Sequence, residues 1–584
     1  MTTDEMKTSA DHAVHAHTRR RWGWTLPILL ALILGFLESS SRTGLGYLAG
    51  WADHFVLSTE GIQWARPDAY ANDWFMQSAP QPHWFFDLIT FGGESLHILP
   101  FVYGAYWAAG LLAFGAATVL LARHLVPSAS TAVAVLVTVV AGLMPWMLGG
   151  TGTPVIAIAL PAVLSANMIY LLIAGMLTGR RVLVVIMGPA VAVIHVQQGS
   201  IAIVLMVALL IVEAVRDRRV DWWLALAGAL TAGVVGFGLL IRPVASNLAD
   251  FVEICDTMIP YHCAAHTWDA REIVSTIGLI LLTVLSVFAV PRARRWLWLS
   301  TVGLATLGYA GGFIMDALSV PFLGPLAQGV NVYRLAAVLI PFAVWGAVSP
   351  LLTRARGWRF LVLLAAWGLG WLMMLTSWGF GSAGLPIPRF ILYTLALLIP
   401  FAAFAILRHR RKDRPRTRSL TALIASVLIL AAAAGNGALT LRPLDLTLTP
   451  FPEFRTWGEQ AEKLVPAGET IVASPQLVWI KFVSERAVIA DCKNVPYGGE
   501  PWTQWKQRLD EMGGWEQCID ITAPGFNTLD AEDLIDLADR YDSDFIAVAT
   551  DVPEQLDGMQ RAGWEPVVDA DGDAYAVLFR RPGA

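Results

Sequence analysis

The chain has 584 residues, of which 56% are hydrophobic and only 15% are charged. Soluble domains carry about 25% charged residues, so this composition and its repeated long apolar runs exclude an ordinary soluble protein and indicate a polytopic membrane protein. The net charge of −5 says little, because the distribution of charge matters more than its sum in such a protein. Nothing in the composition suggests a nucleic-acid partner.

The first 21 residues are polar, contain His12, His15 and His17, and end in three arginines. We interpret residues 1–21 as a disordered cytoplasmic tail rather than a metal site. The apolar run that follows, residues 22–38, has no small-x-small cleavage site. It is therefore predicted to be a retained signal-anchor and the first membrane span.

Residues 39–97 form the predicted first loop on the outside of the membrane. Its stretch WARPDAYANDWFMQSAPQPHWFFD carries the acids Asp68, Asp73 and Asp87 among many aromatic residues. At a membrane surface, aromatic rings lie at headgroup depth and carboxylates face water or a bound cation. The loop is a candidate active site, and the alternative is an interfacial anchor whose acids are merely solvated.

Basic residues fall between alternate apolar runs, which predicts that every second loop is cytoplasmic. The pattern gives about 13 helices of roughly 20 residues each. An odd number puts the N-terminus inside and the segment after the last span outside. The predicted spans lie at 22–38, 98–121, 130–148, 154–177, 182–195, 199–215, 222–241, 272–290, 296–314, 335–352, 360–376, 389–407 and 419–438.

The spans predicted at 182–195 and 199–215 are too short to cross as straight helices, because a bilayer core needs about 20 residues. They meet at the polar sequence HVQQGS. One interpretation is that both helices stop partway and leave His195, Gln197 and Gln198 in a cavity, where polar groups are tolerated at depth. The other is local thinning of the bilayer around a wet turn.

The composition changes near residue 441, and residues 441–584 have the patterning of a globular domain. TWGEQAEKLV followed by ETIVASP predicts a helix and then a strand, AEDLIDLADRY followed by DFIAVAT repeats that order, and YAVLFRR predicts a last strand. We therefore expect a small extracytoplasmic α/β domain. Within it, Trp502 and Trp505 either stack on a carbohydrate acceptor or pack in the core, and we favour the core.

All four cysteines fall in segments that are predicted to lie outside. Cys255 and Cys263 share one loop, and Cys492 and Cys518 share the terminal domain. Two local disulfides are expected in an oxidising compartment, with free buried thiols as the alternative.

Arg334 follows Asn331, Val332 and Tyr333 at the start of a predicted span, where a cation can reach the outer headgroup layer. The planar guanidinium can donate two parallel hydrogen bonds to a phosphate. Arg334 is therefore a candidate for holding a lipid phosphate, and the alternative is ordinary snorkelling at a helix end.

The layout of the chain resembles that of the GT-C glycosyltransferases: many spans, an acidic first outside loop and a soluble α/β domain after the last span. It is similar to the catalytic subunit of oligosaccharyltransferase and to polyprenyl-phosphate-sugar-dependent arabinosyl- and mannosyltransferases. In that family an acid of the first outside loop acts as a base or metal ligand, and Asp68 and Asp73 in RPDAYANDW match it. A strict Asp-x-Asp motif is absent from this loop. The terminal domain also lacks a Trp-Trp-Asp motif, which argues against protein N-glycosylation.

The resemblance implies transfer of a sugar from a polyprenyl-phosphate donor to a glycan, lipid or protein acceptor at the outer face. Asp73 would deprotonate the acceptor hydroxyl, and Asp68 would support it or bind a divalent cation such as Mg or Mn. Arg334, helped by Arg389 or Arg242, would neutralise the departing phosphate. The residues expected to line the donor cavity are His195, Gln198 and Tyr333.

Three other functions are consistent with the sequence. A transporter or flippase of lipid-linked material is suggested by the broken pair of spans, since discontinuous helices are common at transport sites. The chain shows no inverted repeat that would support it. The remaining alternatives are an envelope scaffold without turnover and an acyltransferase-like enzyme that uses outside histidines.

Overall fold

The computed structural model divides into two compact units. The helical unit comprises Met1–Tyr47, Tyr106–Gly236 and Tyr261–Leu444, and the mixed unit comprises Leu48–Ala105, Phe237–Pro260 and Asp445–Ala584. The mixed unit thus joins most of the first loop, a second loop and the terminal domain. The structure describes residues 25–31, 33, 47, 49–79, 83–142, 150, 159–242, 247–290, 295–375, 387–410, 415–435, 446–449, 451–520, 522–569 and 575–583.

Apolar runs form the long helices of the helical unit, because a helix satisfies its own backbone hydrogen bonds in lipid. Seven helices of the described ranges are long and apolar enough to cross a membrane, and an eighth if one bent pair counts as a span. The chain is a multi-pass membrane protein, but these helices do not establish the predicted count of about 13 spans. Most of the predicted first span at 22–38 lies outside the described residues.

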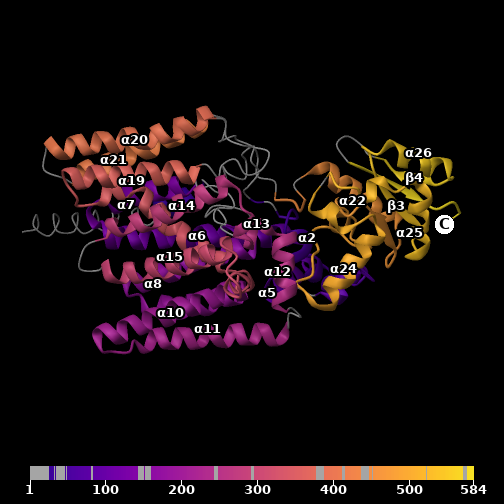
Figure 1. Cartoon of the computed structure of the whole chain (residues 1–584), viewed down its shortest axis with the longest axis horizontal. Coiled ribbons are helices and arrows are strands. Elements are labelled where there is room, and N and C mark those ends of the chain that lie inside the picture. The colour runs from indigo at the N-terminus through magenta and orange to yellow at the C-terminus, as the bar shows by residue number, and fades with distance from the viewer. Residues whose placement is uncertain are drawn as a thin grey trace, which may run out of the picture. The chain divides into compact units, whose positions relative to one another are not determined.

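Each later predicted span overlaps a helix, and the helices run side by side in Figure 1. They are α6 (Leu99–Leu125), α7 (Ser130–Ala141), α8 (Pro161–Thr178), α9 (Arg181–Ile194), α10 (Val196–Asp217), α11 (Trp222–Ile241), α14 (Ala270–Leu285), α15 (Arg295–Ala317), α17 (Ala336–Ala347), α19 (Trp358–Leu375), α20 (Ile387–Arg410) and α21 (Pro415–Gly435). A short helix before α17, α16 (Leu323–Gly329), overlaps no predicted span.

Glycines allow α14 to pack closely against two neighbours. A Cβ on Gly346 of α17 would lie 1.8 Å from the Leu282 carbonyl oxygen, and one on Gly278 would lie 2.5 Å from the Met374 amide nitrogen. Small residues at helix contacts are the usual means of close packing in membranes. The bundle also buries tryptophans whose indole N–H groups are satisfied: Trp345 donates to the Tyr170 hydroxyl at 2.7 Å.

Two breaks interrupt helices of this unit. α9 ends before His195, which is extended at φ −154° and ψ 107°, and α10 begins after it. α9 has 14 residues, but α10 continues for 22 residues to Asp217, so the prediction that both helices are short was wrong for the second. Helix α10 extends beyond the apolar run into the charged residues that follow it. The other break, between α16 and α17, bends the chain by 58° near Asn331 and was not predicted.

The first loop in the mixed unit folds into short helices, α2 (His54–Leu57), α3 (Thr59–Ala65), α4 (Trp74–Ser78) and α5 (Trp84–Ser95). Gly61 of α3 packs directly on α5, because a Cβ there would lie 2.5 Å from both the Asp87 carbonyl oxygen and Thr90 Cβ. Gly61 therefore sets the short distance between these two helices.

A buried chain of hydroxyl groups fixes α5 further. The Tyr103 hydroxyl donates to Ser58 Oγ at 2.8 Å and lies 2.7 Å from Thr90 Oγ1, and His54 Nδ1 lies 2.9 Å from the same Ser58 oxygen. Because buried polar groups are costly unless they are paired, this chain favours one arrangement of α2, α5 and the start of α6.

The terminal domain has the predicted order of helices and strands, with additions. Its predicted elements are α22 (Pro452–Leu464), β1 (Thr470–Ala473), α25 (Ala531–Arg540), β3 (Phe545–Ala549) and β5 (Ala576–Arg580). The added ones are α23 (Ile480–Ser484), β2 (Ala487–Val488), α24 (Gly499–Glu511), α26 (Pro553–Arg561) and β4 (Glu565–Val568), and α12 (Leu248–Thr257) comes from the second loop.

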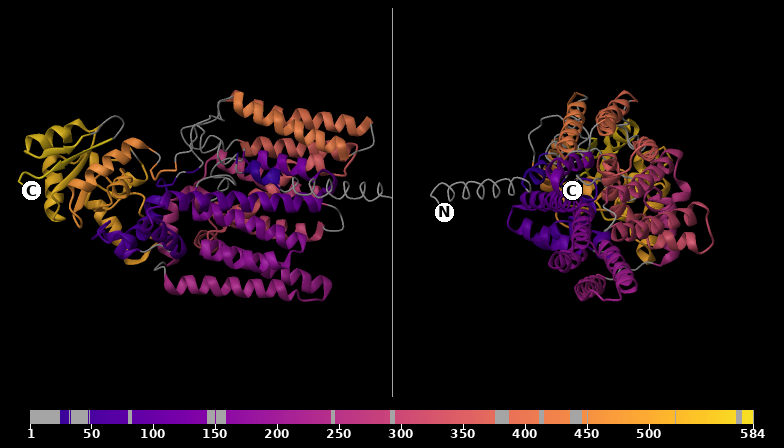
Figure 2. Two further views of the ribbon diagram at one scale, coloured as in Figure 1. Left: turned by 180° about the vertical axis from the view of Figure 1, so that it is seen from behind. Right: turned by 90° about the vertical axis from the view of Figure 1, so that its left-hand side faces the viewer.

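The strands form one sheet in the order β2-β1-β3-β5-β4, visible in Figure 2 with helices beside it. β1 is parallel to β2 and β3, with Ile471 opposite Phe545, whereas β5 is antiparallel to β3 and β4. Every residue of β3 is buried, which is typical of a central strand that is covered on both faces.

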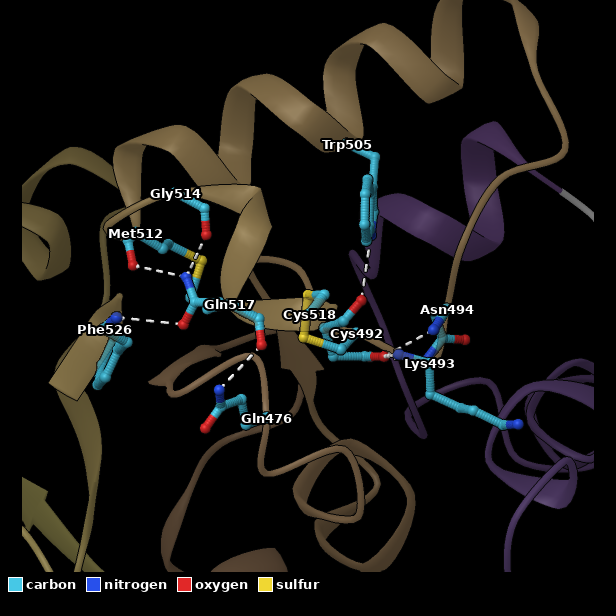
Figure 3. Close-up of a disulfide and its surroundings, with 11 residues drawn as sticks. Gln476, Cys492, Lys493, Asn494, Trp505, Met512, Gly514, Gln517, Cys518 and Phe526 are labelled. Atoms are coloured by element: carbon cyan, nitrogen blue, oxygen red, sulfur yellow. Dashed lines mark hydrogen bonds between the residues drawn. A yellow bond between two sulfur atoms is a disulfide. The ribbon is translucent and has the colours of Figure 1, made fainter. Parts of the chain in front are cut away.

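A disulfide joins Cys492 to Cys518, which are 26 residues apart (Figure 3). Next to it, the Gln517 side chain donates to the carbonyl oxygens of Met512 and Gly514 and accepts from the Phe526 amide. Cys255 and Cys263 are disulfide-bonded as well.

Trp502 and Trp505 belong to the core of the mixed unit. Their exposed fractions are 2% and 0%, and their rings stack with centroids 5.1 Å apart. Trp502 also donates its indole N–H to Glu253 of α12 at 3.1 Å. The rings are therefore not available to stack on a sugar.

Replacing Trp502 with alanine is expected to lower the free energy of unfolding by about 3–5 kcal/mol, because the large buried ring leaves a cavity. Thermal unfolding of the purified protein in detergent measures the loss. Tyr575→Ala, which removes a ring that is 55% exposed, is the control and should cost well under about 1 kcal/mol. Equal effects of the two substitutions would contradict the core position.

Candidate active site

Asp73, the predicted base, lies in a buried ion pair. Its Oδ1 accepts a hydrogen bond from the Met76 amide at 3.0 Å, which makes Asp73 the N-cap of α4. The same oxygen lies 2.7 Å from the Lys481 ammonium of α23, and the two side chains are 1% and 2% exposed. This geometry fastens the loop to the terminal domain and leaves the carboxylate out of reach of an acceptor hydroxyl.

A second buried carboxylate, Asp491, also interacts with Lys481. Burial raises the pKa of the Asp491 carboxyl, and the Lys481 ammonium opposes that rise. Asp491 Oδ1 accepts hydrogen bonds from the amides of Lys493 and Asn494 at 2.8 and 2.7 Å. Lys481 therefore supplies a positive charge to two enclosed acids.

Arg66 provides another link between the first loop and the terminal domain. Its guanidinium lies 2.9 Å from Glu94 and 3.5 Å from Glu462, and it donates a hydrogen bond to Glu485. Tyr70 donates its amide to the Glu485 carbonyl oxygen at 2.8 Å. The loop is thus held on the terminal domain at several independent points.

Two further acids of the first loop, Glu60 and Asp87, lie beside the Arg242 guanidinium, and Glu60 is partly exposed. Arg242, just after α11, donates a hydrogen bond to Glu60, and its Nη2 lies 3.8 Å from Asp87 Oδ2. The Arg242 guanidinium also lies over the Trp64 ring, 5.4 Å from its centroid. The side chains of Arg242, Glu60 and Asp87 are 18%, 16% and 1% exposed. We call these three residues the acid–arginine cluster.

Local packing explains why this cluster forms. Gly61 brings α3 against α5, and the Trp84 ring of α5 packs edge-on against Phe237 of α11, with centroids 5.7 Å apart. Glu60 precedes Gly61, Asp87 lies one turn after Trp84, and Arg242 follows the last turn of α11. Two helix contacts, α3 on α5 and α5 on α11, therefore bring the two acids and the guanidinium together.

Burial shifts the pKa values of both acids of the cluster upwards. Burial raises the pKa of Asp87 to about 8, the Glu60 carboxylate adds to the rise, and Arg242 opposes it. Burial also raises the pKa of Glu60, again against Arg242. We infer that Asp87 carries the proton while Arg242 balances the charge of Glu60. Asp87 Oδ2 is buried and accepts no hydrogen bond from the described residues.

The stability of the protein should fall as pH rises through the range in which Asp87 ionises. The folded-state pKa lies above the ordinary value of 3.8, so the native protein binds this proton more tightly than the unfolded chain does. The stabilisation is complete below about pH 4 and is lost as pH rises through about 8. Wild type should therefore lose stability relative to Asp87→Asn across this window.

Thermal midpoints of the two proteins between about pH 5 and 9 measure this difference. Asp68→Asn is the control, because Asp68 is exposed. A difference between wild type and Asp87→Asn that does not change with pH would contradict the buried, proton-holding carboxyl.

The other predicted site residues belong to the helical unit. Tyr333 is buried and donates its hydroxyl to Asp316 at 2.7 Å, and His266 Nδ1 lies 3.1 Å from the same carboxylate. Arg334 follows in the 3₁₀ turn Val332–Leu335 and is half-buried. Its position at the broken span agrees with the predicted start of a span.

His195 and Gln198 are buried at the break between α9 and α10, with exposed fractions of 7% and 3%. Gln198 donates its side-chain amide to the Ala162 carbonyl oxygen at 3.2 Å. The side chain of Arg389, in the first turn of α20, lies outside the described residues.

The predicted divalent-cation ligands do not fit a metal. Asp73 Oδ1 already faces the Lys481 ammonium, and Asp68 is exposed on the turn before α4. In the ranges that the structure describes, no group of three or more His, Cys, Asp or Glu side chains is arranged to hold a metal ion. We therefore derive no chemical step through a metal.

Sequence reasoning selected Arg242 and named Asp87 among the acids of the first loop, but it assigned Asp87 no role in the transfer. Glu60 was not singled out. A signal existed for Asp87, because it stands between Phe86 and Leu88 in a run of apolar residues. A carboxyl in such a run indicates burial and a raised pKa.

Comparisons with known proteins give a family match and two solved structures. A family profile described as "Domain of unknown function (DUF6798)" matches residues 453–512, and no curated protein matches. The chain is similar to ArnT from Cupriavidus metallidurans in the apo state, at 14% identity and a TM-score of 0.47, over 95% of this chain and 97% of that one. It is also similar to ArnT from Cupriavidus metallidurans bound to undecaprenyl phosphate, at 13% identity and a TM-score of 0.48, over 96% and 99% of the two chains.

The family match spans α22 to α24 and thus includes Lys481 and Trp502. Its description assigns no activity. Because both TM-scores lie below 0.5, we base the function on the chain's own residues.

Proposed function

We propose that this chain is a membrane glycosyltransferase of the GT-C type. It transfers a sugar from a polyprenyl-phosphate donor to a glycan, lipid or protein acceptor of the cell envelope at the outer membrane face. The observation that carries the proposal is the acid–arginine cluster, which joins two acids of the aromatic first loop to Arg242 in a multi-pass membrane protein. Such a transfer needs a carboxylate that takes the acceptor proton and a cation that offsets the charge of the phosphate.

In the proposed step, the acceptor hydroxyl oxygen bonds to the anomeric carbon of the sugar while the bond from that carbon to the phosphate oxygen breaks. The phosphate leaves with the electron pair, and the acceptor proton passes to Glu60. Glu60 suits this role because it is partly exposed and because burial raises its pKa, which makes it a stronger base.

Proton transfer also changes what Arg242 can bind. Once Glu60 is neutral and Asp87 remains protonated, no carboxylate of the cluster competes for the guanidinium. Arg242 can then pair with the departing phosphate, which has gained a negative charge. The cluster thus couples uptake of the acceptor proton to stabilisation of the leaving group.

The predicted acids take different roles in this proposal. Asp73 is a positioning residue that holds the loop on the terminal domain through Lys481. Asp68 is exposed on the turn before α4 and has no role in the proposed step. Arg334 and Arg389 stay candidates for the donor phosphate.

Mass spectrometry of membrane lipids from cells with and without this protein tests the proposal. We expect a sugar-linked polyprenyl phosphate to accumulate when the protein is absent, because its consumption stops. Unchanged polyprenyl lipids together with unchanged envelope glycans would overturn the proposal and favour a transporter or a scaffold.

A further inference from the structure

A cavity of about 600 Å³ lies at one end of the helical unit. The last turns of α8 and α10 and the first turns of α9, α11 and α15 surround it. Figures 1 and 2 show α8, α10, α11 and α15 running side by side with these ends together. The basic loops at this end predict that it faces the cytoplasm. The proposed sugar transfer uses none of the residues that line this cavity.

The inner wall of the cavity is apolar. Leu177, Val184, Leu209 and Leu224 line it, and all four side chains are buried in the bundle. Such a wall accepts the hydrocarbon part of an amphipathic molecule, because burial removes apolar surface from water.

The rim of the cavity carries two charges of each sign. Arg180 and Arg181 provide the positive charges, and Glu213 and Asp221 provide the negative ones. The Arg181 guanidinium lies 3.4 Å from the Asp221 carboxylate, and Arg181 is 60% exposed. The four charges of the rim sum to zero when histidine is neutral. The positive and the negative side chains lie around the same opening.

Tryptophans complete the rim. Trp223 is 45% exposed, and the Arg216 guanidinium lies over the Trp296 ring at 3.8 Å from its centroid. Tryptophan is enriched at the depth of lipid headgroups, where its ring has apolar and polar neighbours. The rim is therefore placed where a headgroup would lie.

We propose that this cavity binds a zwitterionic phospholipid of the phosphatidylethanolamine class. Its phosphate would pair with Arg180 and Arg181, its ammonium with Glu213 and Asp221, and its acyl chains with the apolar wall. An anionic lipid would place its charge beside two carboxylates without an ammonium to offset them. A lone cation would face two guanidiniums, so a molecule that carries both charges fits best.

Native mass spectrometry of the purified full chain in detergent tests the proposal. The protein is mixed with equal amounts of phosphatidylethanolamine and phosphatidylglycerol, and the ratio of the two bound lipids is read within each sample. Wild type is expected to retain phosphatidylethanolamine preferentially. Equal retention of the two lipids would overturn the proposal.

Variants identify the cavity as the site. Arg180→Ala with Arg181→Ala should reduce bound phosphatidylethanolamine on the order of 10-fold, since two charge-assisted contacts to the phosphate are lost. Glu213→Gln should shift the ratio towards phosphatidylglycerol. Arg219→Ala is the matched control, because Arg219 is an exposed cation near this end that does not line the cavity.

The ratio of the two bound lipids within a sample does not depend on how much of a variant folds. The Glu213→Gln variant therefore tests the proposal even if the double arginine variant is unstable. An unchanged ratio in Glu213→Gln, or equal losses in the double arginine variant and in Arg219→Ala, would contradict the assignment.

Discussion

Replacing Lys481 with methionine is expected to lower the free energy of unfolding by about 3–5 kcal/mol, because the Asp73 carboxylate stays buried without its cation. Asp73→Asn should cost less, since the Lys481 ammonium keeps its interaction with the buried Asp491 carboxylate. Asparagine caps helices as well as aspartate does, so this variant keeps the N-cap of α4 and isolates the ion pair. Thermal unfolding of the purified protein measures each loss.

The double variant Asp73→Asn with Lys481→Met should cost less than the sum of the two single losses, because neither member of the Asp73–Lys481 pair is then buried alone. The control is the exposed pair of Lys493 and Asp53, whose atoms lie 2.6 Å apart. Lys493→Met should cost less than about 1 kcal/mol. Additive losses in the double variant would refute the buried pair. Because Asp73→Ala removes both the cap and the pair, loss of transfer in that variant would not identify a base.

Glu60→Gln is expected to reduce the rate of sugar transfer on the order of 10³-fold, because it removes the proposed proton acceptor while it keeps the shape of the side chain. Arg242→Gln should reduce the rate on the order of 10²-fold or more, since it removes the cation at the leaving phosphate. Membranes that contain the accumulated donor lipid provide the substrate, and the appearance of free polyprenyl phosphate measures turnover.

The pH dependence of this rate gives a second test of the same residue. Glu60 must be ionised to accept a proton, and burial raises its pKa, so the wild-type rate should fall as pH drops through that raised value. Asp68→Asn should keep both the rate and the pH profile. A fully active Glu60→Gln variant would remove Glu60 from the mechanism.

Much of the fold follows from local patterns in the sequence. The apolar run at 222–241 gives α11 with the predicted ends, and DFIAVAT gives the buried strand β3. Local sequence patterns did not predict the elements whose structure depends on tertiary contacts. β2 has only two residues and exists because Thr470 and Ile471 pair with it, and the bend at Asn331 depends on a single left-handed residue within an apolar segment.

The candidate site was less predictable because its residues are distant in the sequence. Lys481 and Asp73 are 408 positions apart, and Arg242 and Glu60 are 182 apart. The acidic aromatic sequence of the first loop directs attention to this region, but no local pattern shows which acid pairs with a lysine and which pairs with an arginine. The close packing at Gly61, which brings Glu60 and Asp87 together, is likewise a property of the folded chain.

The most direct test of the proposed transfer combines lipid analysis with variants of the first loop. Cells that lack the protein receive wild type, Asp87→Asn, Glu60→Gln or Asp68→Asn at matched amounts, and their polyprenyl lipids are measured by mass spectrometry. We predict that wild type, Asp68→Asn and Asp87→Asn clear the sugar-linked polyprenyl phosphate, because asparagine mimics the protonated Asp87 carboxyl, whereas Glu60→Gln leaves it accumulated. Identical lipid profiles in all cells, with or without the protein, would contradict the account.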